Sequence, residues 1–241
     1  MNSDDFDSNL LRGNDKSRSV DWRRDFEPVP YPYAIAEMEA RVQQIVAKQA
    51  AELVWLLEHP PLYTAGTSAK PEDLLLPEQF PVYATGRGGQ YTYHGPGQRI
   101  AYLMLDLDGS AGRERDIRRY IQRLEAWVIR VLLEFGVVAE SHPERVGVWV
   151  KTGDRMDKIA AIGVRLRHWV TYHGVAINLS TNLDDYAGIL PCGIADAGVC
   201  SLKSLGRSFT VPDFDEALFY YFGQFFAGAG ACAQGAPTSK S

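Results

Sequence analysis

The sequence has few cysteines, and none of them is spaced like a metal ligand. Its 241 residues include three cysteines, Cys192, Cys200 and Cys232, which form no CxxC pair or other zinc-binding spacing. His168 and His173 are five apart with no accompanying carboxylate pattern, which disfavours a metal site. An odd, sparse set of cysteines after a start without a secretory signal fits a reducing compartment. We therefore expect a cytoplasmic protein without structural disulfides or metal.

Long hydrophobic runs and an excess of positive charge are also missing. No apolar stretch approaches the roughly 18 residues of a membrane-spanning helix. The net charge of −5 and the pI of about 5.6 disfavour a nucleic-acid partner. The 46% of hydrophobic residues can form a substantial core. We expect a soluble protein that binds neither membrane nor nucleic acid, with one domain over residues 20–227 and disordered tails at 1–19 and 228–241.

Hydrophobic periodicity predicts helices and a series of strands. The most regular pattern covers residues 113–135, where apolar residues recur every three or four positions and Gly136 follows as a stop. Further helices are predicted over 33–50 and 212–226. Strands are predicted over 20–22, 52–58, 99–107, 147–151, 158–167 and 170–179. This order predicts an α/β (α+β-like) fold, a mixed sheet with helices packed on it.

The segment from Arg87 to Gln98 is rich in glycine and has no acidic residue. Because glycine has no Cβ, such a segment lets a ligand or a strand approach the backbone closely. The residues 91–93 favour a short strand, and 95–97 favour a tight turn. Taken alone, the segment predicts a binding loop for an unknown ligand. Because the GxGxxG and GxxxxGK[ST] patterns are absent, the sequence does not establish nucleotide binding, which remains the main alternative.

Cys192 is the strongest candidate for a reactive side chain. Pro191 and Gly193 flank it, whereas a cysteine that only fills the core usually lies inside a regular element. A thiol attacks as the thiolate, so it needs a cationic or basic partner. No histidine stands in the local context of the known cysteine proteases. Lys158, just before an apolar strand, is the other candidate, although an edge-strand lysine that prevents aggregation would have the same pattern.

Several short motifs together resemble the octanoyltransferases of lipoate biosynthesis. They occupy residues 59–66, 87–98, 158–163, 173–178 and 190–194, and the resemblance extends from about Trp22 to Phe225. It implies a fold similar to the catalytic domains of lipoate and biotin protein ligases. It also implies transfer of an octanoyl or lipoyl group, through a cysteine thioester and without a cofactor. The donor would be octanoyl-acyl carrier protein, and the acceptors would be lysines of the lipoyl domains of 2-oxoacid dehydrogenases and of the glycine cleavage H protein.

The resemblance also implies which residues form the site. Cys192 would be the nucleophile, and Lys158 the amine that favours its thiolate. The substrate-binding residues would be Arg87, Gly88, Gly89, Gln90, Tyr91, Thr92, Tyr93, His94, Ala161, Ile162, Gly163, Gly174, Val175 and Ala176.

Two other functions are considered alongside the transferase. An ATP-dependent lipoate or biotin ligase of the same fold needs a nucleotide pocket and no nucleophilic thiol, so Cys192 favours the transferase. A non-catalytic module that binds carrier proteins has no use for both Cys192 and Lys158. Arginine recurs every four residues at positions 115, 119 and 123. This stripe is interpreted either as a solvated helix face or as a patch that steers an acidic carrier protein.

Overall fold

Two sheets and three α-helices form the described part of the chain, which is residues 20–108, 115–190 and 198–226 of a computed structural model. The larger sheet has the strand order β1-β2-β6-β10-β9-β8-β7, with β11 paired to β9, and the smaller sheet has the order β4-β3-β5. The strands are β1 (Val20–Arg24), β2 (Glu52–Leu57), β3 (Leu62–Ala65), β4 (Val82–Ala84), β5 (Tyr91–His94), β6 (Gln98–Met104), β7 (Glu140–His142), β8 (Arg145–Thr152), β9 (Arg155–Arg167), β10 (Val170–Asn178) and β11 (Gly198–Val199). The helices are α1 (Tyr31–Val46), α2 (Ile117–Glu134) and α3 (Val211–Phe226), with short 3-10 helices η1 (Pro71–Asp73) and η3 (Leu183–Gly188).

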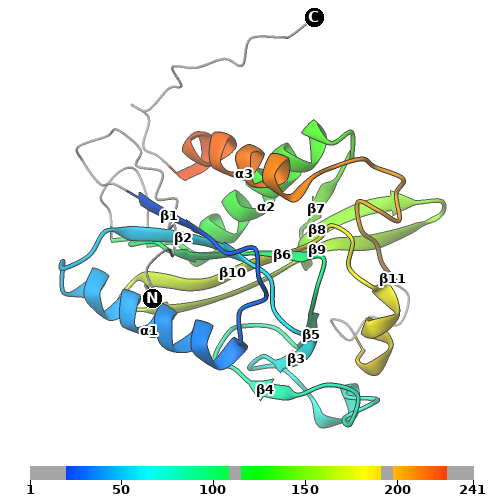
Figure 1. The fold of residues 1–241 in the computed structure, drawn as a ribbon, viewed down its shortest axis with the longest axis horizontal. Coiled ribbons are helices and arrows are strands. Elements are labelled where there is room, and N and C mark those ends of the chain that lie inside the picture. Colours follow the sequence, from blue (N-terminus) through cyan, green and yellow to red (C-terminus); the bar gives the residue numbers. More distant parts are fainter. Residues whose placement is uncertain (1–19, 109–114, 191–197, 227–241) are drawn as a thin grey trace, which may run out of the picture.

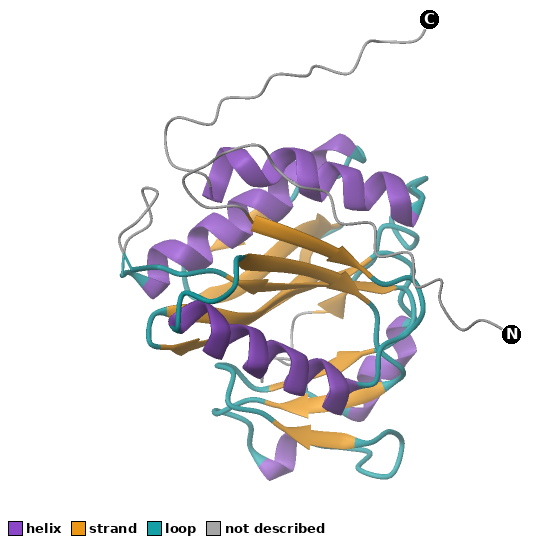
Figure 2. Ribbon diagram, turned by 60° about the vertical axis from the view of Figure 1, so that its left-hand side comes forward, coloured by secondary structure: helices purple, strands orange, loops and turns teal. Residues whose placement is uncertain are grey.

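The larger sheet is the middle layer of the molecule, as predicted for a mixed sheet with packed helices (Figures 1 and 2). Helices α2 and α3 cover one face, where Trp127, Phe214 and Phe222 belong to the largest hydrophobic cluster. Helix α1 covers the other face, where Met38 and Trp55 belong to a second cluster. The smaller sheet lies beyond the α1 side of the larger one (Figure 1). Any space between the two sheets therefore lies on the α1 side of the larger sheet, and the larger sheet separates it from α2 and α3.

Helix α2 shows how the sequence sets the ends of an element. Asp116 caps its start, because a side-chain oxygen accepts hydrogen bonds from the backbone N–H groups of Arg118 and Arg119 at 2.9 and 3.1 Å. Gly136, with φ of +70°, follows the end of the helix, as the sequence predicted. The predicted first residue of the helix, 113, lies outside the described residues.

The other predicted elements are present with shifted ends. Helix α1 begins at Tyr31, because Pro32 fits the first turn. It ends at Val46, because Lys48 has a φ of +58° and leaves the helical conformation. The Thr210 hydroxyl accepts a hydrogen bond from the backbone N–H of Asp213 at 3.2 Å, and so caps the start of α3. In the smaller sheet, β5 corresponds to the short strand predicted over residues 91–93, whereas β3 and β4 were not predicted, since they are short and lie among prolines and glycines.

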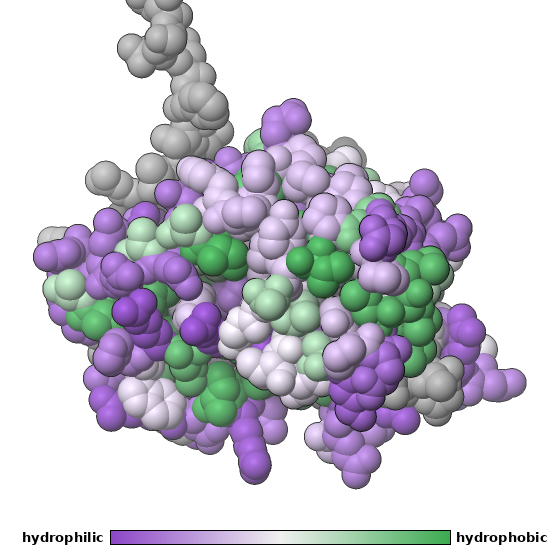
Figure 3. Space-filling view, turned by 90° about the horizontal axis from the view of Figure 1, so that it is seen from below, coloured by the Kyte–Doolittle hydropathy of each residue, from purple (hydrophilic) through white to green (hydrophobic). Residues whose placement is uncertain are grey.

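The surface that carries α1 and the smaller sheet mixes polar and apolar side chains. Figure 3 shows separate hydrophobic areas among hydrophilic ones on this face. Leu75, Leu76 and Val82 are among the exposed large hydrophobic residues of the described chain. No helix in residues 20–108, 115–190 and 198–226 is long and apolar enough to cross a membrane.

Candidate active site

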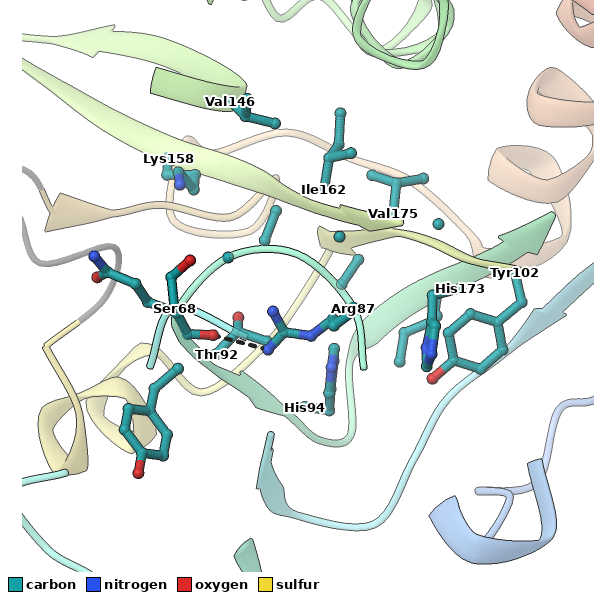
Figure 4. Close-up of a pocket in the computed structure, with 18 of the residues that line it drawn as sticks. Ser68, Arg87, Thr92, His94, Tyr102, Val146, Lys158, Ile162, His173 and Val175 are labelled. Atoms are coloured by element: carbon teal, nitrogen blue, oxygen red, sulfur yellow. Dashed lines mark hydrogen bonds between the residues drawn. The ribbon is translucent and has the colours of Figure 1, made fainter. Parts of the chain in front are cut away.

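A cavity of about 300 Å³ lies between the larger sheet and the glycine-rich segment that follows Arg87. Lys158 lines it, and so do all the predicted substrate-binding residues except Gly88 and Tyr93. In Figure 4, Lys158 and Val146 lie on one side of Arg87, and His173 and Tyr102 lie on the other. Residues that the sequence did not single out for the site also line the cavity, namely Tyr31, Ser68, Ile100, Tyr102, Glu144, Arg145, Val146 and His173.

The floor of the cavity is made of small residues on two neighbouring strands. Ala161 of β9 lies opposite Ala176 of β10, and Gly163 lies opposite Gly174. A Cβ on Gly163 would come within 2.7 Å of the Arg87 Cδ atom, so the absence of a side chain at Gly163 leaves space for the Arg87 side chain. A Cβ on Gly174 would collide with the carbonyl oxygen of Ala101, so the close approach of β6, rather than a ligand, requires this glycine.

Arg87 holds the roof of the cavity in place. Its Nη2 atom donates hydrogen bonds to the carbonyl oxygens of Thr64 and Gln90 at 2.9 and 3.0 Å, and to the Thr64 hydroxyl at 2.6 Å. Its Nη1 atom donates to the carbonyl oxygen of Gly88 at 3.0 Å. The guanidinium therefore joins β3 to the glycine-rich segment, in addition to lining the cavity.

His94, His173 and Tyr102 form the wall of the cavity opposite Lys158, and the buried His59 contacts His94 and Tyr102. The Nδ1 atom of His59 contacts the carbonyl oxygen of Val29, and its Nε2 atom lies 2.8 Å from the hydroxyl of Tyr102. Because a carbonyl oxygen only accepts, His59 donates through Nδ1 and the Tyr102 hydroxyl donates to Nε2. Burial raises the pKa of Tyr102 well above its usual value, so this hydroxyl keeps its proton.

The same burial keeps the imidazoles neutral. It lowers the pKa of His59 to about 4 and that of His173 to about 3, where the positive charge of Arg87 adds to the effect. The pKa of His94 is also lowered well below its usual value, chiefly by burial. His173 adopts a φ of +60° within β10, a strained conformation for a residue other than glycine. The wall is thus uncharged near pH 7, and it suits an apolar substrate group.

Lys158 reaches the cavity because of an irregularity in its strand. In the β8–β9 pair, Val148 lies opposite Ala160 but Trp149 lies opposite Lys158, so Ile159 is an extra residue on β9. In a regular strand, Lys158 and Ala161 would point to opposite faces, since they are three residues apart. The bulge brings both to the cavity. The Nζ atom of Lys158 lies 4.6 Å from the centre of the Trp149 ring.

The location of Lys158 excludes the edge-strand interpretation. Strand β9 lies between β8 and β10, inside the larger sheet, and Lys158 is only 7% exposed. Strand β11, which follows the segment 191–197, pairs in parallel with β9, and Val199 lies opposite Lys158. Cys192 lies outside the described residues, as do Pro191, Gly193 and Cys232.

Cys200 has the properties of a core residue. It is buried in the larger cluster, and its Sγ atom contacts the carbonyl oxygen of Asp157 at 3.8 Å. Burial and the nearby Asp157 carboxylate raise the pKa of its thiol to about 12. Few Cys200 side chains are therefore thiolates near neutral pH, which agrees with the interpretation of this residue as a small hydrophobic side chain.

Two of the predicted substrate-binding residues lie apart from the cavity. Tyr93 points to the other face of β5, where it is 1% exposed and its hydroxyl donates to Asp185 at 2.7 Å. The alternation of a strand explains this, since Thr92 and His94 point to the cavity. The backbone N–H of Gly88 donates to the carbonyl oxygen of Val164 at 3.2 Å, which attaches the glycine-rich segment to β9 and occupies this amide.

The arginine stripe of α2 lies on the far side of the larger sheet from the cavity (Figure 1). Arg115 pairs with Asp108 at 2.6 Å. Arg130, seven residues after Arg123, contacts Glu134 and the Tyr221 hydroxyl. This position favours the interpretation of the stripe as a solvated face.

Comparisons with known proteins agree with this architecture. Residues 30–223 match the family described as the lipoyl protein ligase A/B catalytic domain. An octanoyltransferase of Paramagnetospirillum magneticum is 58% identical over 208 residues, which are 86% of this chain and 97% of that protein. One of Parvibaculum lavamentivorans is 56% identical over 210 residues, with 86% and 92% covered. A bipartite lipoate protein ligase from Thermoplasma acidophilum, solved in a study that includes its E2 lipoyl domain, shares the fold with a TM-score of 0.61 at 14% identity, over 84% of this chain and 82% of that one.

Proposed function

Because the chain belongs to the octanoyltransferases of the lipoyl protein ligase A/B catalytic family, we propose that Cys192 carries its octanoyl group and Lys158 is the proton partner of that thiol. The enzyme is an acyltransferase of lipoate biosynthesis. The observation that carries the proposal is the buried Lys158 on the cavity wall, next to the strand β11 that follows residues 191–197. We propose octanoyl-acyl carrier protein as the donor, and lipoyl domains, including those of 2-oxoacid dehydrogenases and the glycine cleavage H protein, as acceptors.

In the first half-reaction, the Cys192 thiolate attacks the carbonyl carbon of the donor thioester. The new bond joins this carbon to Sγ, and the bond from the carbon to the carrier sulfur breaks. The leaving carrier thiolate takes the proton of the Lys158 ammonium group, so Lys158 becomes neutral. One thioester replaces another at nearly equal free energy, and the step therefore needs no ATP.

In the second half-reaction, the amine of the acceptor lysine attacks the acyl-enzyme. A C–N bond forms, the C–S bond to Cys192 breaks, and the thiolate is regenerated. The neutral Lys158 accepts the proton that the attacking nitrogen loses, which restores the ammonium group. Because Lys158 gives one proton to the carrier thiolate and later takes another from the attacking nitrogen, the cycle leaves the enzyme unchanged.

The cavity supports the binding of an alkyl chain. Its floor of alanines and glycines leaves space, and the neutral His94, His173 and Tyr102 place no charge against methylene groups. The three residue-to-residue steps of β9 from Lys158 to Ala161 span at most roughly 10 Å. An extended eight-carbon chain with bonds of about 1.5 Å has a similar length of roughly 9 Å. The chain would therefore reach Ala161 and Ala176 from a carbonyl group near Lys158.

Intact-mass measurement after incubation with octanoyl-acyl carrier protein, without ATP, tests the proposal. We expect one octanoyl group on the wild-type protein and on Cys200→Ala, and none on Cys192→Ala. Cys192→Ala should also lose transfer to a lipoyl domain, while Cys200→Ala keeps most of it. Acylation of Cys192→Ala, or a strict requirement for ATP, would contradict the proposal and favour the ligase alternative.

A further inference from the structure

Glu125 is an acidic residue on the buried side of α2. Its neighbours in the sequence include Leu124, Trp127 and Val128, which are all fully buried in the larger hydrophobic cluster. Glu125 itself is only 6% exposed. A buried carboxylate lowers the stability of the folded protein unless hydrogen bonds or a positive charge compensate it. The contacts of Glu125 show which groups do so.

The contacts of Glu125 lead to Lys158 through one glycine. Its Oε1 atom accepts a hydrogen bond from the backbone N–H of Gly147 at 3.0 Å. Gly147 has a φ of +128° and lies next to the β8–β9 bulge. A Cβ at Gly147 would come within 3.2 Å of the Lys158 Cε atom, so the lysine side chain passes directly over this glycine. Glu125 therefore fixes the segment against which Lys158 packs.

The two charges also act on each other. Burial raises the pKa of Glu125, while the hydrogen bond from Gly147 and the positive charge of Lys158 act to lower it. The Glu125 carboxylate therefore lies within electrostatic range of the Lys158 amine. Of the other charged groups nearby, Glu144 and Arg145 line the same cavity, and Asp157 is engaged with Thr152 and Arg155.

We propose that Glu125 is a positioning residue for Lys158: its buried carboxylate holds the Gly147 backbone over which the Lys158 side chain lies, and places a negative charge near the lysine amine. Trp149 completes the arrangement, because its ring face lies 4.6 Å from the Lys158 Nζ atom and attracts a cation. Helix α2 thus acts on the cavity from the opposite face of the sheet. The consequence for catalysis rests on the proposed function, in which the ammonium group favours the Cys192 thiolate.

The pH dependence of Lys158 acetylation tests this proposal without using activity. Only the neutral amine reacts with acetic anhydride, and the extent of reaction at Lys158 can be read from its peptide by mass spectrometry. In Glu125→Gln the amide oxygen can still accept the Gly147 hydrogen bond, but the negative charge is gone. We expect Lys158 to become reactive about one pH unit lower in this variant. Glu134→Gln, at the exposed end of α2, should leave the profile unchanged.

A second measurement covers the case in which Glu125→Gln fails to fold. Lys158→Met leaves the Glu125 carboxylate without its counter-charge, which raises the pKa of Glu125 further in the folded state. A raised carboxyl pKa lowers the stability as the pH rises, so this variant should lose more stability relative to wild type at pH 8 than at pH 5. Urea unfolding at the two pH values measures this difference.

The outcomes separate this proposal from the proposed function. An unshifted acetylation profile in Glu125→Gln, or a stability loss in Lys158→Met that is equal at both pH values, would overturn the role of Glu125. If Lys158→Met kept full octanoyl transfer, the catalytic role of Lys158 would fail, while a shifted acetylation profile would still support the positioning by Glu125.

Discussion

At the scale of single residues, the site depends on side chains whose neighbours decide their chemistry. Cys200 is the one cysteine among the described residues, and burial makes it inert by raising the pKa of its thiol to about 12. Lys158 differs from the exposed lysines because a glycine, a tryptophan ring and a buried carboxylate surround it. Residue type alone would not distinguish these cases.

Replacement of Lys158 by methionine should remove the proton partner while keeping most of the side-chain volume. We expect octanoyl transfer to fall by at least about 100-fold, the usual lower range for loss of a general acid–base group. The pH at which Cys192 reacts with iodoacetamide should rise, because a positive neighbour that favours the thiolate is gone. Peptide mapping separates the reaction of Cys192 from that of the other thiols. Lys151→Met, on the exposed part of β8, is the control, and an unchanged Cys192 profile in Lys158→Met would show that the lysine does not act on the thiol.

Replacement of Ala176 by leucine should shorten the acyl chain that the enzyme accepts. Ala176 lines the cavity opposite Ala161, where the end of an octanoyl chain is expected. Loss of space for two or three methylene groups, at about 0.8 kcal/mol each, should lower kcat/KM for octanoyl thioesters roughly 15- to 60-fold. Butanoyl thioesters should be affected far less. Equal losses for both chain lengths would place the acyl chain elsewhere, and Ala84→Leu on the exposed strand β4 controls for a general effect.

At the scale of elements, the buried ion pair of Arg99 and Asp215 joins β6 to α3. The Nε and Nη2 atoms of Arg99 donate to the two carboxylate oxygens of Asp215 at 2.9 and 2.7 Å. Both side chains are almost completely buried, and Arg99 also donates to the carbonyl oxygen of Asp25 at 2.8 Å. Arg99 is therefore a structural residue on the side of the sheet away from the cavity.

Removal of one partner should cost more stability than removal of both. Arg99→Met leaves the Asp215 carboxylate buried and uncompensated, and we expect the free energy of unfolding to fall by about 3–5 kcal/mol. Addition of Asp215→Leu should recover a large part of this loss. Arg130→Met, which removes an exposed pair with Glu134 on α2, should change stability by less than about 1 kcal/mol. Urea unfolding measures all four proteins, and a double variant no more stable than Arg99→Met would contradict this account.

At the scale of the whole molecule, buried histidines from three distant parts of the chain come together beside the cavity. His59 follows β2, His94 ends β5 and His173 lies in β10. The rings of His59 and His94 are 5.9 Å apart, and Tyr102 contacts both His59 and His173. Folding therefore takes these imidazoles out of water in their neutral form.

The stability of the protein should fall in mild acid. The pKa values of His59 and His173 are about 4 and about 3 in the folded protein, below the usual value, so the unfolded chain binds more protons. Stability is complete above about pH 6.5 and declines as the pH falls toward 4, by about 1.4 kcal/mol per pH unit for each histidine. The raised pKa values of Glu125 and Asp215 act in the opposite direction and reduce the slope.

Unfolding midpoints in urea between pH 7.5 and pH 4.5 measure this decline. His59→Asn should flatten the slope, since one of the neutral imidazoles is gone. His142→Asn, in the exposed hairpin of β7 and β8, should leave the slope unchanged. If wild type and His59→Asn had the same slope, His59 would not contribute to acid sensitivity.

The sequence by itself determined the main elements and the family of this protein. The apolar spacing of α2 and the continuous apolar runs of β2 and β6 predicted helices packed on a mixed sheet, because side-chain periodicity is a local property of the chain. The short motifs between residues 59 and 194 identified the octanoyltransferases, because their residues and order are specific. The same motifs included most of the residues that line the cavity, because the resemblance implied those residues one by one.

Only the tertiary structure decided which residues meet. The extra residue in β9 turned Lys158 to the same face as Ala161, which strict alternation would have excluded, and alternation in β5 turned Tyr93 away. Tyr102, His173 and Glu125 became part of the site or its surroundings through contacts between elements far apart in the sequence. The physical reason is that burial, and with it the charge state of each histidine and carboxylate, depends on the complete packing of both faces of the sheet.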